Sequence, residues 1–234
     1  MALLIILTLI TIATPFALIF VALFDKEKKI YQYATKIFIR LFFLLNFINI
    51  KNKIDYNDVL KSKIGEKRIY VLNHQSLLDG LIIFLMPGNV KFMANEMYAK
   101  IPIFGLGVSF TGNIAVKRGE DSGYLNQYYQ AGEIIDNGYP LVIFPEGTRN
   151  REGKIGKFYN SAFMLAIEKK ADIVPVVLKT WNVLKPGEFI VRNNDFRVKF
   201  LDPIKYDDIK DKNYKNISNE IREKMIAELK ILNN

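Results

Sequence analysis

The chain has 234 residues, a formal net charge of +9 at pH 7, no cysteine and a single histidine. A chain of this length can bury a sizeable core unaided, and the lack of cysteine excludes disulfides, thiolate catalysis and cysteine–zinc sites. One histidine cannot build a histidine-rich metal site, and the positive charge favours anionic partners such as nucleic acid, anionic lipid or phosphorylated substrates.

The N-terminal stretch suggests a lipid environment. Residues 1–24 contain no charged side chain, and as a helix they would extend about 36 Å, enough to cross a hydrocarbon core of roughly 30 Å. Three lysines follow between positions 26 and 29, which favours a cytoplasmic location for the remaining chain. A second apolar stretch, residues 37–47, suits a helix at the membrane interface. We expect residues 1–50 to be a membrane-associated helical segment, placed at the cytoplasmic (inner) membrane with the active site facing the cytoplasm.

Strands and helices then alternate over residues 51–234, which predicts an α/β domain. Strands are expected at residues 68–72, 90–93, 114–116, 141–144, 173–179, 189–191 and 196–200, and helices at 76–85, 124–136, 159–169 and 217–231. The apolar strand 141–144 is typical of a strand buried on both faces of a mostly parallel sheet. The predicted fold is a mostly parallel mixed sheet flanked by helices and preceded by a hydrophobic helical membrane hairpin.

The only histidine lies in residues 73–79, which read NHQSLLD, directly after the first expected strand. An unperturbed histidine, with a pKa of about 6.5, is well suited to accept and return a proton at neutral pH. If a helix begins near Ser76, Asp79 lies in its first turn, where it could bind one ring nitrogen of His74 and stabilise the imidazolium. The same residues also form a capping box, which is a purely structural interpretation.

A second motif, residues 144–149 (FPEGTR), follows an apolar strand, where ligands of α/β sheets collect. Gly147 permits a tight turn, Thr148 offers a hydroxyl, and Arg149 presents a planar fork that matches phosphate oxygens. Glu146 could anchor Arg149 or another basic group. Further cations follow at Arg151, Lys154 and Lys157. The structural alternative is an ordinary turn with solvated charges.

A third motif, residues 112–118 (GNIAVKR), ends in Arg118, which could supply a second phosphate contact or could simply be a surface cation. Other motifs are incomplete: the chain lacks a dinucleotide fingerprint, a phosphate loop and a Gly-x-Ser-x-Gly elbow. Its aromatic residues do not interleave with a basic stripe, so a nucleic-acid partner is not expected.

Taken in order, these three motifs and residues 173–177 (IVPVV) resemble the four sequence blocks of the glycerolipid acyltransferase family. The resemblance covers roughly residues 68 to 201 and is strongest to the bacterial 1-acyl-sn-glycerol-3-phosphate (lysophosphatidic acid) acyltransferases. It implies that His74 is the general base on a glycerol hydroxyl and that Asp79 orients it. Arg149, on a substrate-binding loop shaped by Glu146, Gly147 and Thr148, would bind the phosphate of the acceptor, and Arg118 would assist.

The implied reaction transfers an acyl group from acyl-CoA or acyl carrier protein to lysophosphatidic acid, giving phosphatidic acid. The thioester is a co-substrate, and neither a cofactor nor a metal is implied. The lipid bilayer is an expected partner. Ala115, Lys117 and Asn150 depart from the common pattern, which leaves the acceptor open. The alternatives are another lysophospholipid or lyso-amino-lipid acceptor, and a non-catalytic membrane protein that binds anionic lipid.

Overall fold

The described part of the chain, in a computed structural model, comprises residues 53–56, 67–95, 113–116, 121–183 and 195–233, with scattered positions between Tyr33 and Leu44. Over these residues seven strands form one sheet in the order β1-β7-β6-β2-β5-β3-β4. β7 runs antiparallel to β6, and the other neighbouring pairs are parallel. The fold is therefore α/β with a mostly parallel mixed sheet, as the alternation of elements predicts.

The strands are β1 (Ile54–Asp55), β2 (Arg68–Leu72), β3 (Lys91–Asn95), β4 (Ile114–Val116), β5 (Leu141–Ile143), β6 (Asp172–Lys179) and β7 (Arg197–Phe200). The helices are α3 (Leu78–Ile83), α6 (Asp121–Asp136), α7 (Ser161–Glu168), α8 (Tyr206–Ile209) and α9 (Tyr214–Asn233). Most of them match the predicted elements to within three residues. The strand expected at 189–191 lies outside the described residues.

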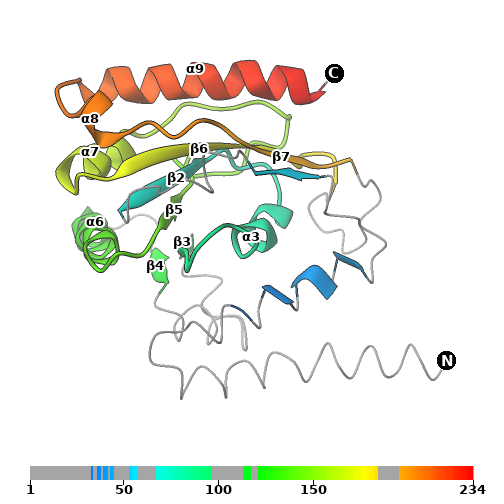
Figure 1. Ribbon diagram of the computed structural model, residues 1–234, viewed down its shortest axis with the longest axis horizontal. Coiled ribbons are helices and arrows are strands. Elements are labelled where there is room, and N and C mark those ends of the chain that lie inside the picture. The colour runs from blue at the N-terminus through cyan, green and yellow to red at the C-terminus, as the bar shows by residue number, and fades with distance from the viewer. Residues whose placement is uncertain are drawn as a thin grey trace.

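The sheet separates two hydrophobic cores. Side chains alternate along β2, so Tyr70 and Leu72 face one core while Ile69 and Val71 face the other. Helix α3 covers the first face and helices α6, α7 and α9 contribute to the second, and Figure 1 shows α9 lying along the sheet. β6 is buried at all eight positions, as expected for a strand covered on both faces.

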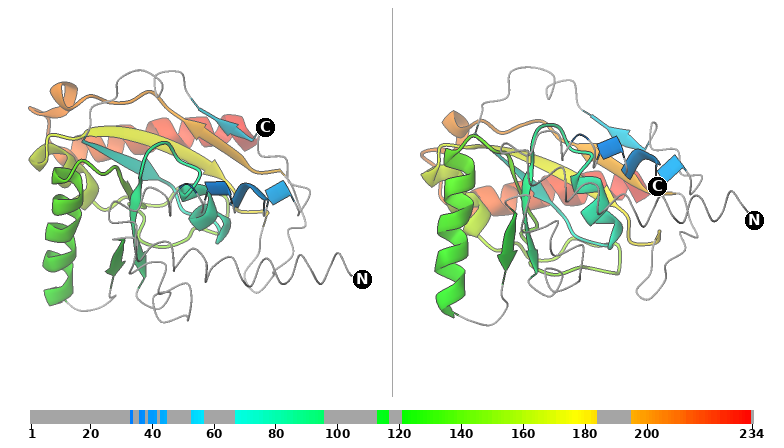
Figure 2. Two further views of the ribbon diagram at one scale, coloured as in Figure 1. Left: turned by 60° about the horizontal axis from the view of Figure 1, so that its bottom comes forward. Right: turned by 90° about the horizontal axis from the view of Figure 1, so that it is seen from below.

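Three parallel strands, β6, β2 and β5, lie side by side at the centre of the sheet. Figure 2 shows them from two further directions, with α9 crossing behind them in its left-hand view. Their last residues are Lys179, Leu72 and Ile143, so the loops that follow leave the sheet at one edge. Ligands of α/β sheets bind at this carboxyl edge.

The prediction of an N-terminal membrane hairpin is wrong for this fold. In the part of the chain that the structure describes, no helix is both long and apolar enough to cross a bilayer. Most of residues 1–50 lie outside that part, but Ile39 and Phe43 are buried in the first core, where Phe43 stacks on Phe196 with 5.8 Å between ring centroids. Apolarity alone does not distinguish a lipid-facing side chain from one that packs on protein.

Candidate active site

The single histidine contacts the carboxylate expected to orient it. His74 lies in the loop after β2, and Asp79 is the second residue of α3. The Nδ1 atom of His74 lies 2.8 Å from Oδ2 of Asp79. A proton on Nδ1 would donate to this carboxylate, which leaves Nε2 free to accept another proton. The His74 side chain is 24% exposed and Asp79 is fully buried, so a substrate can reach the imidazole but not the carboxylate.

Both oxygens of Asp79 accept hydrogen bonds from the surrounding chain. Oδ2 accepts the backbone N–H groups of Gln75 at 2.7 Å and Ser76 at 2.9 Å, and Oδ1 accepts the hydroxyl of Thr180 at 2.5 Å. The bond from Ser76 is one half of the capping box, so the structural and catalytic interpretations of this stretch are compatible. With these donors the buried carboxylate is fixed in place, and it holds the His74 ring in turn.

The second motif holds His74 as well. The imidazole stacks on Phe144, the residue after β5, with 4.1 Å between ring centroids and 26° between planes. The backbone N–H of His74 donates to Glu146 Oε1 at 2.9 Å, and its carbonyl accepts the N–H of Asn150 at 2.7 Å. The loops after β2 and β5 therefore form one site, although 72 positions separate His74 from Glu146 in the sequence.

Glu146 is buried and joins two loops through backbone amides. Its Oε1 accepts the N–H of His74, and its Oε2 accepts the N–H of Gly156 at 2.7 Å. Burial raises the pKa of Glu146 above its ordinary value, and the two backbone hydrogen bonds oppose that rise. A Cβ at position 156 would lie 2.9 Å from Oε2, so a larger residue there would displace the Glu146 carboxylate. Glu146 thus binds backbone groups, whereas the motif alone suggests a basic side chain as its partner.

An open pocket of about 750 Å³ is lined by the loop after β5. Two of its lining residues, Glu146 and Asn150, hydrogen-bond the backbone of His74. The lining includes Glu146, Thr148, Arg149, Asn150, Arg151 and Lys157. Gly147 turns the chain at the start of this loop with φ of 63°, a left-handed conformation that glycine adopts readily. The lining has three cations, the carboxylates of Glu146 and Glu152, and the hydroxyls of Thr148 and Tyr159. The cations and the Thr148 hydroxyl suit the oxygens of a phosphate group.

Two further side chains at this edge, those of Asn73 and Thr180, belong to the site, although the sequence motifs assign them no function. The Asn73 amide pairs with β6: it donates to the Leu178 carbonyl at 2.8 Å and accepts the Leu178 N–H at 2.7 Å. Thr180, besides binding Asp79, donates its N–H to Gln75 Oε1 at 3.0 Å. A hydroxyl directly after a buried strand is a signal that could have identified Thr180, because parallel strands end at the same edge.

Arg118, the expected second phosphate contact, lies outside the described residues, and its role stays a prediction. From the same motif, the Asn113 side chain accepts the N–H of Phe92 at 3.0 Å and so helps to hold β3. Within the described ranges, no three His, Cys, Asp or Glu side chains are grouped to hold a metal ion.

These motifs and this fold are shared with a known family. A sequence model described as Acyltransferase matches residues 48–179, which include His74, Asp79 and the whole loop after β5. The match covers more than half of the chain, and the chain belongs to the Acyltransferase family.

Among its relatives are proteins named 1-acyl-sn-glycerol-3-phosphate acyltransferase. The one from Helicobacter pylori is 38% identical over 141 residues, which cover 58% of this chain and 56% of the relative. LPAT1, a chloroplastic one from Arabidopsis thaliana, is 28% identical over 192 residues, which cover 79% of this chain and 52% of the relative. This chain thus spans about half the length of these relatives.

The crystal structure of the 1-acyl-sn-glycerophosphate (LPA) acyltransferase PlsC from Thermotoga maritima resembles this structure with a TM-score of 0.76. The resemblance covers 92% of this chain and 87% of that chain. At 19% identity, it shows that the two proteins share a fold.

Proposed function

We propose that the protein transfers a fatty acyl group from an acyl thioester to the free 2-hydroxyl of 1-acyl-glycerol-3-phosphate, giving phosphatidic acid for phospholipid synthesis. The observation that carries this proposal is the 2.8 Å contact between His74 and Asp79, next to a loop that holds the backbone of His74 and lines a pocket with three cations. The pair supplies a general base, and the pocket offers a place for an anionic head group. The names of the relatives support the same acceptor.

In the proposed reaction, Nε2 of His74 takes the proton of the acceptor hydroxyl while that oxygen attacks the thioester carbonyl carbon. Asp79, at Nδ1, stabilises the imidazolium and holds the ring in the required tautomer. The tetrahedral intermediate then collapses, the carbon–sulfur bond breaks, and the departing thiolate takes the proton from His74. No group of the protein is acylated, which suits a chain without cysteine.

We assign the acceptor phosphate to the pocket lined by the loop after β5. Arg149 can bind two phosphate oxygens through its planar guanidinium, and Thr148 can donate its hydroxyl to a third. Both residues line the pocket. Arg118 is proposed as a second cationic contact on the basis of its sequence motif.

We propose acyl-CoA or an acylated acyl carrier protein as the donor. Both are anionic, which suits a chain with a net charge of +9. Because the acceptor and the product are membrane lipids, we place the protein at the cytoplasmic face of the inner membrane, where the acceptor can be taken from the bilayer.

Acyl transfer by the purified full chain tests the acceptor assignment. Long-chain acyl-CoA is offered with 1-acyl-glycerol-3-phosphate or with 1-acylglycerol, which lacks the phosphate. We expect KM for the phosphorylated acceptor to be lower by about 10-fold or more, since a charge-assisted contact is lost without it. Arg149→Gln should remove most of that difference. Lys154→Gln should not, because Lys154 is 74% exposed on the same loop and pairs with Glu152.

Equal KM values for the two acceptors would contradict the phosphate assignment. Transfer only to another lysophospholipid or to a lyso-amino lipid would favour the alternative acceptors. Binding to anionic vesicles without transfer to any acceptor, from acyl-CoA or from acyl carrier protein, would favour a non-catalytic lipid-binding protein.

A further inference from the structure

We infer that Arg222, on the C-terminal helix α9, is a positioning residue for the acceptor-binding pocket. Arg222 lies well beyond residue 179, where the family match ends, and none of the four sequence blocks includes it. It acts through the loop that lines the pocket. The effect that we predict on KM rests on the proposed function, whereas the effect that we predict on the structure of the loop does not.

The guanidinium of Arg222 binds two successive carbonyl groups of that loop. Nε donates to the Gly156 carbonyl at 2.6 Å, and Nη2 donates to the Ile155 carbonyl at 3.1 Å. Nη1 donates to Glu223 on the same helix at 2.8 Å, so each of the three guanidinium nitrogens has a partner. A planar fork suits two adjacent acceptors, which the single ammonium group of lysine cannot match.

The helix that carries Arg222 is itself firmly anchored. Ile221 and Met225 of α9 are fully buried in the second core, on the face of the sheet opposite α3. Arg222 is 29% exposed, at the boundary between this core and solvent. The contact therefore connects a rigid element to residues 151–160, which form neither a helix nor a strand.

Gly156 connects the Arg222 contact to His74 through Glu146. Its carbonyl is held by Arg222, and its N–H donates to Glu146 Oε2 at 2.7 Å. Oε1 of the same carboxylate accepts the N–H of His74 at 2.9 Å. Arg222, Gly156, Glu146 and His74 thus form a continuous series of hydrogen bonds from α9 to the candidate base. Gly156 and Glu146 also line the pocket.

Loss of Arg222 should loosen the pocket more than the base. The contact between His74 and Asp79 does not depend on residue 156, whereas the pocket is built largely from this loop. We expect Arg222→Met to raise KM for the phosphorylated acceptor by about 10-fold with a smaller change in kcat, because a misplaced binding group weakens acceptor positioning. Arg222→Lys can bind one carbonyl, so its KM should lie between those of Arg222→Met and wild type.

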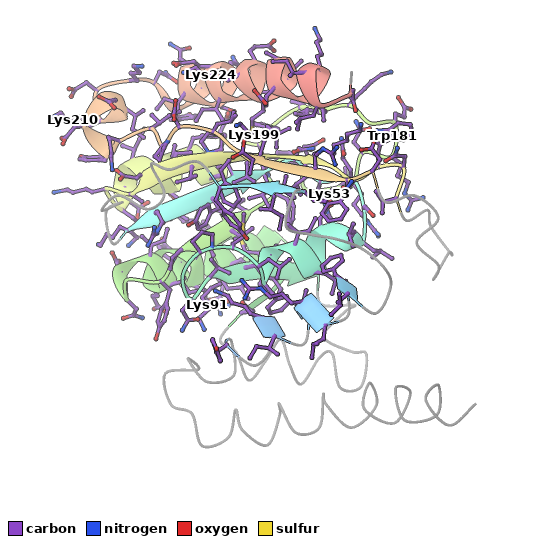
Figure 3. The ribbon with its side chains drawn as sticks, turned by 45° about the vertical axis from the view of Figure 1, so that its right-hand side comes forward. Lys53, Lys91, Trp181, Lys199, Lys210 and Lys224 are labelled. Carbon is purple, nitrogen blue, oxygen red and sulfur yellow. The ribbon has the colours of Figure 1, made fainter. Side chains whose placement is uncertain are left out.

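Amide hydrogen exchange tests the positioning role without reference to activity. In Arg222→Met, the amides of residues 153–158 should exchange at least about 10-fold faster, while those of β2 and β6 should stay protected. The matched control is Lys224→Met, a cation two residues further on that pairs with Glu220 and lies on the outer side of α9 in Figure 3. It should change neither exchange nor KM.

Unchanged exchange in residues 153–158 would overturn the inference. If amides throughout the sheet of Arg222→Met exchange faster, the substitution destabilises the whole protein, and the test passes to Arg222→Lys. Faster exchange confined to residues 153–158 in Arg222→Lys supports the positioning role. Exchange at the wild-type rate there rejects it. If wild type transfers no acyl group to 1-acyl-glycerol-3-phosphate, the proposed function fails. The exchange result still decides whether Arg222 positions the loop.

Discussion

Thr180 donates its hydroxyl to Oδ1 of Asp79 at 2.5 Å, and neither residue has exposed surface. We predict that Thr180→Val lowers kcat about 10-fold, equivalent to about 1.4 kcal/mol, because Asp79 loses a donor that fixes its orientation toward His74. Thr180→Ser keeps the hydroxyl and should retain most of the activity. The measurement is kcat for each variant across pH. A Val variant with the wild-type kcat would show that the bond has no part in catalysis.

Glu146 gives a prediction about pH and stability. Burial raises the pKa of its carboxyl in the folded protein above the ordinary 4.5, so the folded protein binds this proton more tightly than the unfolded chain. The stability gained from that proton is fully present below the pKa that Glu146 has in the unfolded chain. It is lost as pH rises through the higher pKa that Glu146 has in the folded protein. Glu146→Gln cannot ionise, and it should therefore gain stability relative to wild type as pH rises above 4.5.

Unfolding of wild type and Glu146→Gln by urea at several pH values between 4 and 8 measures this difference. Acyl transfer should change in the opposite direction: an amide has only one oxygen, so His74 or Gly156 would lose its acceptor. We expect at least about a 10-fold loss of kcat/KM at pH 7. A stability difference that does not vary with pH would show that Glu146 is not perturbed by burial.

Residue spacing predicts local contacts better than distant ones. His74 and Asp79 are five positions apart, so the start of a helix is enough to suggest that they meet. The partners of Asn73 and Thr180 lie 105 and 101 positions away, and they depend on the register between β2 and β6. That register follows from packing on both faces of the sheet, which the sequence motifs do not specify.

At the scale of elements, the loop after β5 depends on the conformation of Gly147. Its φ is 63°, and an added Cβ would lie 3.1 Å from the ring of Tyr159. We predict that Gly147→Ala destabilises the protein by about 1–2 kcal/mol, since L-residues with a side chain are strained in this region, and that it raises KM for the acceptor.

Gly80→Ala in α3 is the matched control for this substitution. Nothing lies within 4 Å of the Cβ that it adds, and alanine favours a helix over glycine by about 1 kcal/mol. Gly80→Ala should therefore leave stability unchanged or raise it in urea unfolding. Equal effects of the two substitutions would show that the left-handed turn at Gly147 is not required.

Element positions follow well from the sequence, and element ends follow less well. The expected strand at residues 68–72 is β2 as observed, because its apolar run is bounded by polar residues. The helix expected over residues 76–85 is shorter, from Leu78 to Ile83. At its start the N–H of Ser76 binds the Asp79 carboxylate. At its end the N–H groups of Leu85 and Met86 form three-residue turns instead of continuing the helix. β1 has only two residues and leaves no pattern for a prediction.

For the whole molecule, the excess of positive charge predicts a dependence on salt. The chain carries a net charge of +9, and Arg149, Arg151 and Lys157 line the open pocket. Screening over about 8 Å at physiological ionic strength should weaken attraction of a phosphorylated acceptor. We predict that its KM rises several-fold between 0.05 and 0.5 M NaCl, a change of the order expected for exposed charges. With 1-acylglycerol the KM should barely change, and an equal change for both would contradict the prediction.

The α/β architecture could be predicted from the alternation of strands and helices, and the site could be placed at the carboxyl edge of the sheet. The membrane hairpin could not be judged from composition, because Ile39 and Phe43 are as apolar as lipid-facing residues yet pack in the core. Arg222 reaches the pocket from a helix about 70 positions after the second motif, and only the packing of α9 on the sheet reveals it.

The role of His74 as general base is best tested by acyl transfer from long-chain acyl-CoA to 1-acyl-glycerol-3-phosphate, with wild type beside His74→Ala and His74→Gln. We predict a loss of kcat of about 100-fold or more in both variants. KM for the acceptor should change little, because the phosphate is assigned to the loop after β5. Unfolding by urea confirms that the variants are folded. Folded variants that turn over as fast as wild type would contradict the mechanism.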